Sequence, residues 1–480
     1  MDSEVISHYL SDETRRAAPL PDGFTGSAGG AACGDLVRIS IGLGAGRVDR
    51  VSFDAEGCAT TRAAAAALAE EVEGLALLDA ALISPDDVVE LLGGVGSQGR
   101  HATELAADAL HRALAQAAGS GQELAASGEG ERVLVAMSGG VDSAVAALLE
   151  RERGAEVVAV TLKLWADQRT DAAKSCCSPL AVLGARGLAH SLGIPHLTLD
   201  LEDTFRERVV GAFVAGYRAG ETPNPCVLCN GDVRIDAMIA LADRLGCESL
   251  VTGHYARITD DGEGPLLAAA ADPAKDQSYM LSGLATSSLE HLRFPLAGLT
   301  KPEVREIATG AGLEVASKAE SQDLCFLAGE GKRSFLERHG GLGERRGELV
   351  DVEGNVVGEH PGHHAFTVGQ RRGLGVASPE PVYVLRTDAE SNRVVVGPRE
   401  RLARRTVRVR EATLHRPGGR IDRVRLRYHA HALPCRVRDA GPGEHPELEL
   451  ELGEPAYGVA PGQTACLLDG DLVVGRATIA

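Results

Sequence analysis

Between residues 132 and 290, short apolar runs alternate with longer stretches of helical periodicity. The apolar runs are continuous, which is typical of strands buried on both faces of a parallel sheet, and they span 133–136, 157–162, 195–199 and 250–252. The helical stretches span 143–153, 179–192, 204–217 and 233–245. This order of strands and helices predicts a parallel sheet covered on both faces, with ligands at the carboxyl ends of the strands.

The pattern differs on both sides of this region. Before it, 37–41 and 48–53 alternate like two paired strands, and alanine-rich stretches at 60–72 and 102–117 predict helices. After about residue 346 helical periodicity vanishes, and short alternating strands between glycine and proline turns predict a small β-barrel. The expected fold class is α/β plus β, with an α+β domain and linker at 1–128, a nucleotide domain at 129–290, a linking domain at 291–360 and a β-barrel at 361–480.

The most informative stretch joins the first apolar run to the first helix through the turn Ser138-Gly139-Gly140-Val141-Asp142-Ser143. A strand, a glycine turn and a helix start place backbone N–H groups and a helix N-terminus around one point, which makes an anion site. No Gly-Lys-Ser/Thr sequence follows, so this is not a Walker P-loop. The turn therefore predicts a phosphate-binding loop, and an ordinary Ser/Gly turn is the alternative.

This SGGVDS loop resembles that of the PP-loop ATP-pyrophosphatase superfamily, whose members adenylate a carbonyl oxygen and release pyrophosphate. Further motifs are NPCVLCN at 224–230, TGHYAR at 252–257, KDQSYM at 275–280, DLCF at 323–326 and FTVGQRRGLG at 366–375. Together they resemble the tRNA 2-thiouridylases, the MnmA family, over about residues 132–480. The resemblance implies an enzyme, a tRNA-uridine 2-sulfurtransferase, in which ATP adenylates the C2 oxygen of uridine 34 and sulfur then displaces AMP.

The resemblance also implies which residues bind ATP. By family position they are Ala136, Met137, Ser138, Gly139, Gly140, Val141, Asp142, Ser143, Leu162 and Gly253. The pyrophosphate leaving group needs Mg²⁺, which prefers carboxylate and phosphate oxygens, and Asp142 is the nearest candidate carboxylate. An N-cap role for Asp142 is the alternative, and the two roles are compatible.

Three cysteines carry the expected sulfur chemistry: Cys226, Cys229 and Cys325. In the commoner family pattern position 226 is aspartate, and the resemblance then implies that Cys229 and Cys325 act as nucleophile and persulfide carrier, with a disulfide left afterwards. Cys226 adds a third soft ligand, and three cysteines on a [4Fe–4S] cluster leave one iron open for hydrosulfide. A cluster-dependent enzyme is the favoured hypothesis. The persulfide route and a structural zinc at the Cys-x-x-Cys are the alternatives.

The first domain, at 1–128, resembles the IscU/NifU-type iron–sulfur scaffolds, in which three cysteines and an aspartate hold a nascent cluster or zinc. Cys33, Asp35 and Cys58 match that pattern, but Ala102 stands where the third cysteine is expected. Two interpretations of this domain remain open. In one it binds a metal through these three residues and His101 as a fourth ligand, and in the other it is a degenerate scaffold that serves only as a docking domain. Residues 119–131 predict a flexible linker, through which the domain would deliver iron–sulfur or sulfur in cis.

The net charge of −19 argues against nonspecific nucleic-acid binding, but the charge is uneven. Residues 1–118 carry eight Lys/Arg against 18 Asp/Glu, a net −10, and 399–427 carry 11 Arg against three Asp/Glu, a net +8. Alternation at 408–410 and 423–427 puts arginines on one strand face and predicts a phosphate-binding surface. By family position the residues that contact tRNA are Asn224, Pro225, Lys275, Asp276, Gln277, Arg427 and Tyr428.

Ten cysteines, a polar start and the lack of any apolar run of about 18 residues predict a cytoplasmic protein with no membrane association. The expected partners are the tRNA anticodon stem-loop and a sulfur donor such as a cysteine desulfurase or a sulfur relay protein. A sulfur or iron–sulfur carrier and a PP-loop synthetase for a small substrate are the other classes of function. The phosphate loop, the KDQSYM motif and the basic barrel favour the tRNA enzyme.

Overall fold

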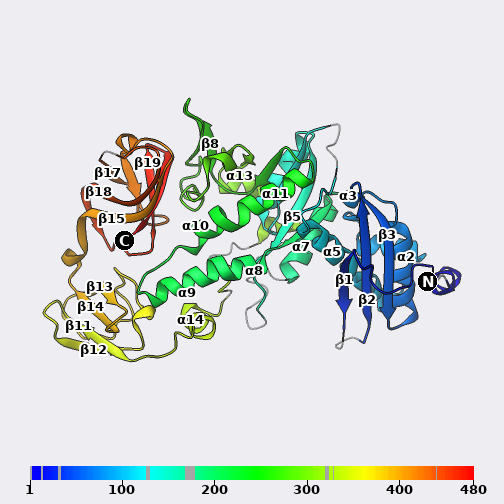
Figure 1. Ribbon diagram of the computed structural model, residues 1–480, viewed down its shortest axis with the longest axis horizontal. Coiled ribbons are helices and arrows are strands. Elements are labelled where there is room, and N and C mark those ends of the chain that lie inside the picture. The colour runs from blue at the N-terminus through cyan, green and yellow to red at the C-terminus, as the bar shows by residue number, and fades with distance from the viewer. Residues whose placement is uncertain are drawn as a thin grey trace.

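The computed structural model describes residues 3–11, 14–30, 34–125, 130–167, 179–318, 324–327, 329–438 and 440–480. The chain runs from an N-terminal α+β unit, through a nucleotide domain with a central parallel sheet, to a C-terminal barrel at the other end of the molecule (Figure 1). In the described part of the chain, no helix combines the length and apolar character needed to cross a membrane.

The parallel sheet has the strand order β10-β7-β4-β5-β6. Its strands are β4 (Arg132–Ala136), β5 (Glu156–Lys163), β6 (His196–Asp200), β7 (Ser249–Thr252) and β10 (Leu292–Arg293). The apolar run of β4 is buried on both sides: Val133 and Val135 pack in the cluster that contains Ala146 and Ala189, and Leu134 belongs to the main core. The predicted doubly covered parallel sheet is confirmed.

The helices of this region are α6 (Val141–Glu152), α7 (Pro179–Ser191), α8 (Glu202–Phe205), α9 (Gly211–Arg218), α10 (Pro225–Cys229), α11 (Ile235–Arg244), α12 (Thr286–Leu289) and α13 (Lys301–Gly310). A π-helical turn, Arg206–Val210, joins α8 to α9, and a second, Asn230–Arg234, joins α10 to α11. Two long helical rods result, and α10 packs against the first π-turn. The second rod carries the Cys-x-x-Cys at its start.

A small sheet of order β12-β11-β14-β13 follows helix α14 (Lys332–Gly340). Its strands are β11 (Gly347–Val350), β12 (Val356–His360), β13 (Tyr383–Asp388) and β14 (Arg393–Gly397). Short 3₁₀ turns are Glu314–Ser317, His363–Ala365, Arg399–Leu402 and Gly418–Arg420. This unit connects the nucleotide domain to the barrel.

Six strands form the C-terminal barrel, because the first also pairs with the last and closes the sheet. They are β15 (Ala403–Leu414), β16 (Arg423–Arg425), β17 (Leu433–Arg436), β18 (Gly443–Tyr457), β19 (Thr464–Asp469) and β20 (Leu472–Ile479). The predicted barrel is confirmed. A hairpin from the nucleotide region, β8 (Arg257–Asp260) and β9 (Pro265–Ala268), extends the same sheet by pairing Leu267 with Val473. The two regions are therefore joined through the backbone.

The N-terminal unit has one antiparallel sheet, with strands β1 (Phe24–Gly29), β2 (Leu36–Gly44) and β3 (Arg47–Glu56). Its helices are α1 (Ser3–Ser11), α2 (Ala59–Val72), α3 (Leu77–Ala80), α4 (Pro85–Leu91) and α5 (Ser97–Gly119). Gly26 lets α5 lie close to the sheet, since a Cβ there would meet the carbonyl oxygen of Ala109 at 1.9 Å. This α+β arrangement agrees with the predicted fold class.

The N-terminal unit is docked on the nucleotide domain. Asp108 on α5 accepts a hydrogen bond from Arg186 on α7 at 2.9 Å, and His190 of the same helix contacts the carbonyl oxygen of Ala81 at 3.0 Å. In the predicted linker, Leu124 is fully buried and its backbone N–H donates to the carbonyl of Arg244. The prediction of a flexible tether is therefore wrong for residues 119–125, because an apolar side chain anchors them.

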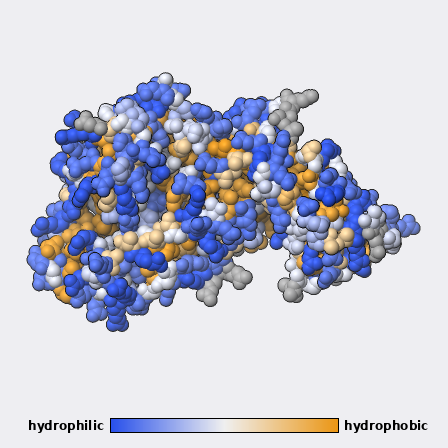
Figure 2. Space-filling view, in the orientation of Figure 1, coloured by the Kyte–Doolittle hydropathy of each residue, from blue (hydrophilic) through white to orange (hydrophobic). Residues whose placement is uncertain are grey.

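The face of the molecule drawn in Figure 2 is mostly hydrophilic, and apolar residues show between the hydrophilic ones along its middle, at its lower left and on the N-terminal unit at its right. Large apolar side chains that are more than a third exposed include Leu180 and Leu183 at the start of α7. The same holds for Val352, Val356 and Val357 of the β11–β12 hairpin.

Candidate active site

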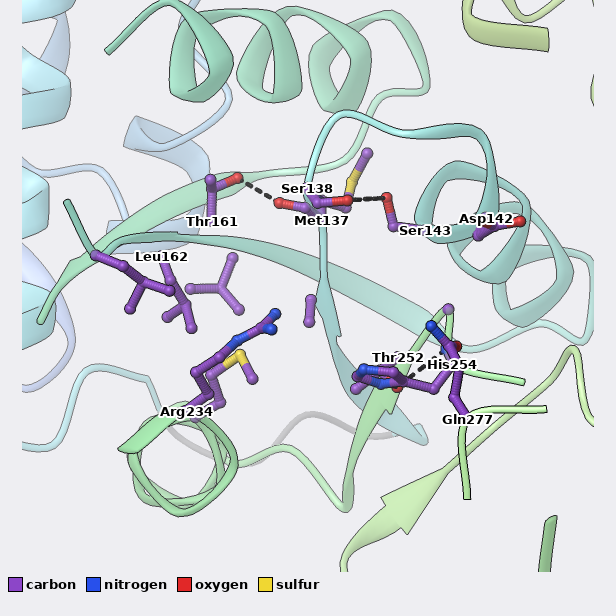
Figure 3. Close-up of a pocket in the computed structure, with 15 residues that line it drawn as sticks. Met137, Ser138, Asp142, Ser143, Thr161, Leu162, Arg234, Thr252, His254 and Gln277 are labelled. Atoms are coloured by element: carbon purple, nitrogen blue, oxygen red, sulfur yellow. Dashed lines mark hydrogen bonds between the residues drawn. The ribbon is translucent and has the colours of Figure 1, made fainter. Parts of the chain in front are cut away.

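The turn between β4 and α6 has the form of an anion site. Gly139 adopts a left-handed conformation with φ of 69°, and Gly140 is the N-cap of α6. The Ser143 hydroxyl accepts from the backbone N–H of Ser138 at 3.2 Å and donates to the carbonyl of Gly140 at 3.1 Å, so it stabilises the turn. The Ser138 and Ser143 hydroxyl oxygens lie 3.4 Å apart (Figure 3). Asp142 is the second residue of the helix. Its N-cap interpretation is therefore wrong.

A pocket of about 190 Å³ opens at the carboxyl ends of β4, β5 and β7, next to this turn. Seven of the ten predicted ATP-binding residues line it: Ala136, Met137, Ser138, Asp142, Ser143, Leu162 and Gly253. The other three, Gly139, Gly140 and Val141, lie in the same turn and helix start. The structure thus brings together in one place residues that the sequence separates by more than a hundred positions.

Gly253 at this site lies against the start of α6. A Cβ at Gly253 would be 2.7 Å from both the carbonyl carbon of Asp142 and the backbone nitrogen of Ser143. Contacts this short do not occur in folded proteins, so a larger residue would displace the helix start. The glycine is thus required for the close approach of the two segments.

Sequence reasoning missed several residues of the pocket wall. Thr161 donates to the carbonyl of Met137 at 2.7 Å and accepts from Nε2 of His196 at 2.8 Å. His254 contacts Thr252 at 2.7 Å, and burial, with the nearby Arg234, lowers the pKa of His254 to about 3. His254 and Thr252 stand inside a motif that the sequence did single out. Thr161 likewise begins the stretch TLKLW at 161–165, which the sequence places at the end of a predicted strand. Arg234 carries no signal of its own, because only the second helical rod brings it to the turn.

Asp142 is ion-paired within the protein. Nζ of Lys301, at the start of α13, lies 2.7 Å and 2.8 Å from its two carboxylate oxygens, and the Tyr255 hydroxyl donates to it at 2.8 Å. Asp142 is the one acidic side chain among the described residues that line the pocket. A magnesium ion would have to share this carboxylate with a buried ammonium group. Asp142 is therefore poorly suited to serve as a Mg²⁺ ligand. The phosphate oxygens of a bound nucleotide would be the better ligands for Mg²⁺ at this site.

The Cys-x-x-Cys is held at the start of a helix. Asn224 is the N-cap of α10, and its Oδ1 accepts from the backbone N–H groups of Cys226 at 3.2 Å and Val227 at 3.4 Å. Pro225 occupies the first helical turn, where its missing N–H costs nothing. Cys226 is half-buried and Cys229, one turn later on the same face, is buried.

Cys325 comes from a segment far along the chain, yet it reaches the same helices. The next residue, Phe326, packs edge-to-face on Phe213 and Phe205 with ring centroids 5.1 Å and 5.8 Å apart. These two rings flank the π-turn on which α10 packs. Both cysteine-bearing segments therefore lie against one helical rod. Three thiols, two of them at Cys-x-x-Cys spacing, are a soft donor set that fits a [4Fe–4S] cluster.

Three other cysteines have different surroundings. Cys247, Cys435 and Cys466 are buried, and burial raises the pKa of each thiol to about 12. At neutral pH such thiols stay protonated and are poor nucleophiles or metal ligands. They are core residues of the nucleotide domain and the barrel.

The predicted tRNA-contacting residues differ in exposure and in the contacts they make within the protein. Lys275 is half-buried, whereas Asp276 is buried and ion-paired with Arg425 at 2.9 Å. Gln277 lines the nucleotide pocket, where its Oε1 accepts from the backbone N–H of Tyr255 at 2.9 Å. In the barrel, Arg427 is exposed and donates to the carbonyl of Gly458 at 2.7 Å. The half-buried Tyr428 ring lies beside His429, with centroids 3.8 Å apart.

The predicted arginine face of the barrel is divided between two roles. Arg410 binds Glu221 with both terminal nitrogens at 2.9 Å, and Arg425 binds Asp276, so these two guanidinium groups hold the barrel to the nucleotide domain. The prediction of a phosphate-binding surface is therefore wrong for Arg410 and Arg425. The other arginines of the two stretches 408–410 and 423–427 are exposed: Arg408, Arg423 and Arg427.

The N-terminal unit brings two of its predicted ligands together. Oδ1 of Asp35 accepts from the backbone N–H of Cys58 at 3.1 Å, and Gly57 makes room for it, since a Cβ there would lie 1.9 Å from this oxygen. Cys58 is exposed at the N-cap of α2, and His101 is exposed on α5. Cys33 lies outside the described residues, and Ala102 is buried.

Four family descriptions match successive parts of the chain. They are "NifU-like N terminal domain" over residues 2–122, "tRNA methyl transferase HUP domain" over 131–329, "tRNA methyl transferase PRC-barrel domain" over 333–398 and "Aminomethyltransferase beta-barrel domain" over 406–479. Among solved structures, that of a 4-thiouridine synthetase–RNA complex with bound ATP is 21% identical, with a TM-score of 0.29, over 44% of this chain and 51% of that chain.

Relatives match over much greater lengths. The bifunctional protein NifU/MnmA of Rubrobacter xylanophilus is 45% identical over 488 residues, which cover 99% of this chain and 98% of that protein. The tRNA-specific 2-thiouridylase MnmA of Acidithiobacillus ferrooxidans is 43% identical over 354 residues, which cover 73% of this chain and 98% of that enzyme. On this evidence the chain belongs to the MnmA family of tRNA-specific 2-thiouridylases, with a NifU-like domain at its N-terminus.

Proposed function

We propose that this protein is a tRNA-uridine 2-sulfurtransferase that adenylates the C2 oxygen of uridine 34 and replaces that oxygen with sulfur. One structural relationship carries the proposal. The rod that starts with Cys226 and Cys229 continues through Arg234 and Met238, and both of these residues line the nucleotide pocket. Arg234 follows Cys229 by five positions, which is no more than about 7.5 Å along the axis, since the π-helical turn at Asn230–Arg234 rises less per residue than an α-helix. A base activated at the pocket would thus lie beside the thiols.

The pocket suits the first step. The N–H groups at the start of α6 and the glycine turn would hold the phosphates of ATP. The wall opposite, formed by Val160, Leu162, Leu164 and Met238, is apolar and would pack on the adenine. Adenylation joins the uracil C2 oxygen to the α-phosphorus and breaks its bond to the bridging oxygen, which leaves with pyrophosphate.

The thiols suit the second step. A sulfur nucleophile forms a bond to C2, and the C2–O bond breaks as AMP leaves with the oxygen. We propose that Cys226, Cys229 and Cys325 hold a [4Fe–4S] cluster, which when bound would supply an open iron for hydrosulfide. The alternative is a persulfide on one of Cys229 and Cys325, with a disulfide between them afterwards. Cys226 favours the cluster, because the persulfide route has no use for a third thiol.

The substrate would reach the site along the junction of barrel, linking sheet and cysteine helix. The turn before Asn224 is tied to the barrel, because the backbone N–H of Thr222 donates to the carbonyl of Pro461 at 2.7 Å and Gln463 donates to the carbonyl of Thr222 at 2.6 Å. The basic loop at 370–373 and the exposed Arg427 flank this junction. We propose that Asn224, Pro225, Lys275, Gln277, Arg427 and Tyr428 contact the tRNA and that Asp276 acts by orienting its loop.

Pyrophosphate release and thiouridine formation, measured with and without an anticodon stem-loop RNA, test the proposal. We expect both to require the RNA. A carrier of sulfur or iron–sulfur would release no pyrophosphate, and a synthetase for a small substrate would release it without RNA. The descriptions that speak of methyl transfer fit the site less well, because methyl transfer does not need the cleavage of ATP to AMP and pyrophosphate.

Iron content and activity of the Cys226→Asp variant separate the two sulfur routes. If the cluster is used, anaerobically purified protein should absorb near 400 nm, and the variant should lose both the absorbance and thiolation. Cys247→Ala, which removes a buried thiol elsewhere, should change neither. Full thiolation by iron-free protein would exclude the cluster route and leave the persulfide route.

A further inference from the structure

A second cavity, of about 390 Å³, lies between the first helical rod and α14, which pack side by side (Figure 1). The rod contributes Gly211 and four side chains spaced four residues apart, which share one helix face: Arg206, Val210, Val214 and Arg218. Trp165, just beyond the end of β5, and His339 of α14 complete the described part of the wall. An arginine thus stands at each end of an apolar depression, which we call the Trp165 groove.

The Trp165 groove is next to the nucleotide pocket. Leu164 lines that pocket, and the following residue, Trp165, lines the groove. Consecutive Cα atoms are only about 3.8 Å apart, so the two cavities are neighbours at the end of β5. The Trp165 ring also packs on Phe205, and Phe205 packs on Phe326, which follows Cys325. A ligand in the groove would thus lie close to both the activation site and the sulfur-carrying segment.

The two arginines of the groove have partners that an anion could replace. Arg218 donates to a backbone carbonyl at the end of α14 at 2.8 Å. Arg206 lies over the Trp165 ring, 5.2 Å from its centre, and donates to Glu202 at 3.3 Å. Glu202 also binds Lys163 at 3.0 Å, so it stays paired when Arg206 turns away. A phosphate oxygen forms a stronger, charge-assisted hydrogen bond with a guanidinium group than a neutral carbonyl does.

The acidic side chains beside the groove are already neutralised. Arg338 binds Asp167 at 2.6 Å, and its Nε donates to Glu330 at 2.9 Å. Asp167 also contacts Nε2 of His339 at 3.1 Å. These carboxylates would therefore repel an anion in the groove only weakly, and the charges of the two groove arginines remain available to it.

Gly211 keeps the groove open. It has helical dihedral angles within the rod, where glycine is a poor helix former. A Cβ added there would come no closer than 3.7 Å to the nearest neighbour, the carbonyl oxygen of Arg206, which is an ordinary contact. Packing around the Cβ position therefore does not require glycine, but a longer side chain at this position would fill the groove.

We propose that the Trp165 groove binds a single-stranded part of the RNA substrate beside the reacting uridine, with one base in the groove and flanking phosphates on Arg206 and Arg218. The proposal rests on the proposed function, because it takes RNA as the substrate. The two arginines are twelve positions apart, at most about 18 Å along the helix axis. A stacked strand rises about 3.4 Å per nucleotide, so the arginines can reach phosphates of different nucleotides. Proteins commonly read such loops by splaying bases onto aromatic rings or guanidinium planes.

Two measurements on the full-length protein test the occupancy of the groove. Anisotropy of a labelled anticodon stem-loop gives the RNA affinity, and the emission of Trp165, the one tryptophan of the chain, reports on the groove itself. RNA should quench this emission. Gly211→Leu should abolish the quenching and weaken RNA binding by roughly tenfold, as expected for the loss of one stacked base. Its melting temperature should not fall, because leucine is the better helix former.

Ala212→Leu is the matched control, since Ala212 is the next residue of the rod, is exposed and does not line the groove. It should alter neither RNA affinity nor quenching. Arg206→Gln and Arg218→Gln should each lower the slope of log affinity against log salt concentration by about 0.7, the value for one phosphate contact of a single strand. Arg208→Gln, exposed on the same rod but outside the groove, should keep the wild-type slope.

Stem-loops that lack the base on one side or the other of the reacting uridine identify the occupant. One of them should bind the wild type as weakly as intact RNA binds Gly211→Leu, and should lose little more in that variant, because the same contact is already gone. Additive losses for both RNAs, or unchanged salt slopes in both arginine variants, would overturn the inference. Quenching by free uridine monophosphate, with RNA affinity unaffected by Gly211→Leu, would assign the groove to a free nucleotide and overturn it too.

The wild type separates this inference from the proposed function. A wild type that thiolates RNA while the groove variants bind RNA normally would leave the function standing without the groove. A wild type that fills the groove with RNA but releases no pyrophosphate would overturn the function instead.

Discussion

Arg410 of the barrel holds Glu221 of the nucleotide domain through two parallel hydrogen bonds of 2.9 Å. Glu221 begins the turn that ends at Asn224, the cap of the cysteine helix. The ion pair raises the pKa of Arg410, so its charge is retained at any pH at which the protein folds. A barrel expected to bind RNA thus also fixes the position of the thiols.

The first prediction concerns this pair. Arg410→Met should slow thiolation because the turn before Cys226 loses its clamp. Because the pair is partly exposed, we expect its loss to cost only about 1 kcal/mol. If that cost appears in the activation barrier, the single-turnover rate at saturating RNA falls by roughly fivefold. Arg408→Met, on the same strand face but exposed, should alter RNA affinity and not that rate. Equal effects of the two variants on the rate would contradict a clamping role.

The second prediction concerns Gly253. Gly253→Ala places a methyl group 2.7 Å from the backbone at the start of α6, which must shift the phosphate loop. We expect ATP affinity to fall by roughly tenfold or more and stability by about 1–3 kcal/mol, as for other overpacked sites. Gly184→Ala on α7, where an added methyl meets nothing within 4 Å, is the control and should not weaken ATP binding. Calorimetric titration with ATP and thermal melts measure both effects.

The third prediction concerns the docked N-terminal unit. Asp108→Asn leaves Arg186, a largely buried guanidinium, without its charge partner at the domain junction. Breaking a buried pair in this way costs about 3 kcal/mol. Asp54→Asn removes the partner of Arg38 in a pair that is more than a third exposed, and should cost less than about 1 kcal/mol. Similar melting temperatures for the two variants would show that the units are held together by other contacts.

The fourth prediction concerns pH. Burial lowers the pKa of His196 to about 3, so this ring is neutral in the folded protein at pH 5. The unfolded chain, with an ordinary pKa of about 6.5, binds a proton there, and stability must therefore fall as pH decreases below about 6.5. One such histidine contributes about 2 kcal/mol of this loss at pH 5. His196→Gln should lose correspondingly less stability between pH 7.5 and pH 5 in denaturant titrations, and an identical loss would exclude His196 as a source.

The strand–turn–helix at 132–152 was predictable because its information is local. A strand, two glycines and a helix start are adjacent in sequence, and their backbone geometry by itself gives the turn the form of an anion site. The alternation of Val409, Val424 and Leu426 with arginines likewise predicted which barrel side chains are buried, and all three are. The order of strands and helices was enough for the parallel sheet.

The partners of charged side chains were decided by tertiary structure alone. Arg410 and Arg408 are equivalent in the sequence pattern, yet one binds Glu221 and the other is exposed, since only the docking of barrel on nucleotide domain brings a carboxylate to one of them. Tertiary structure alone also decided that Lys301 pairs with Asp142 and that Lys318 donates to the carbonyl of Gly139. Periodicity tells which face of an element is buried, because burial follows from the element's own geometry. It cannot tell what covers that face, because the covering residues come from distant segments whose approach is set by the packing of the whole chain.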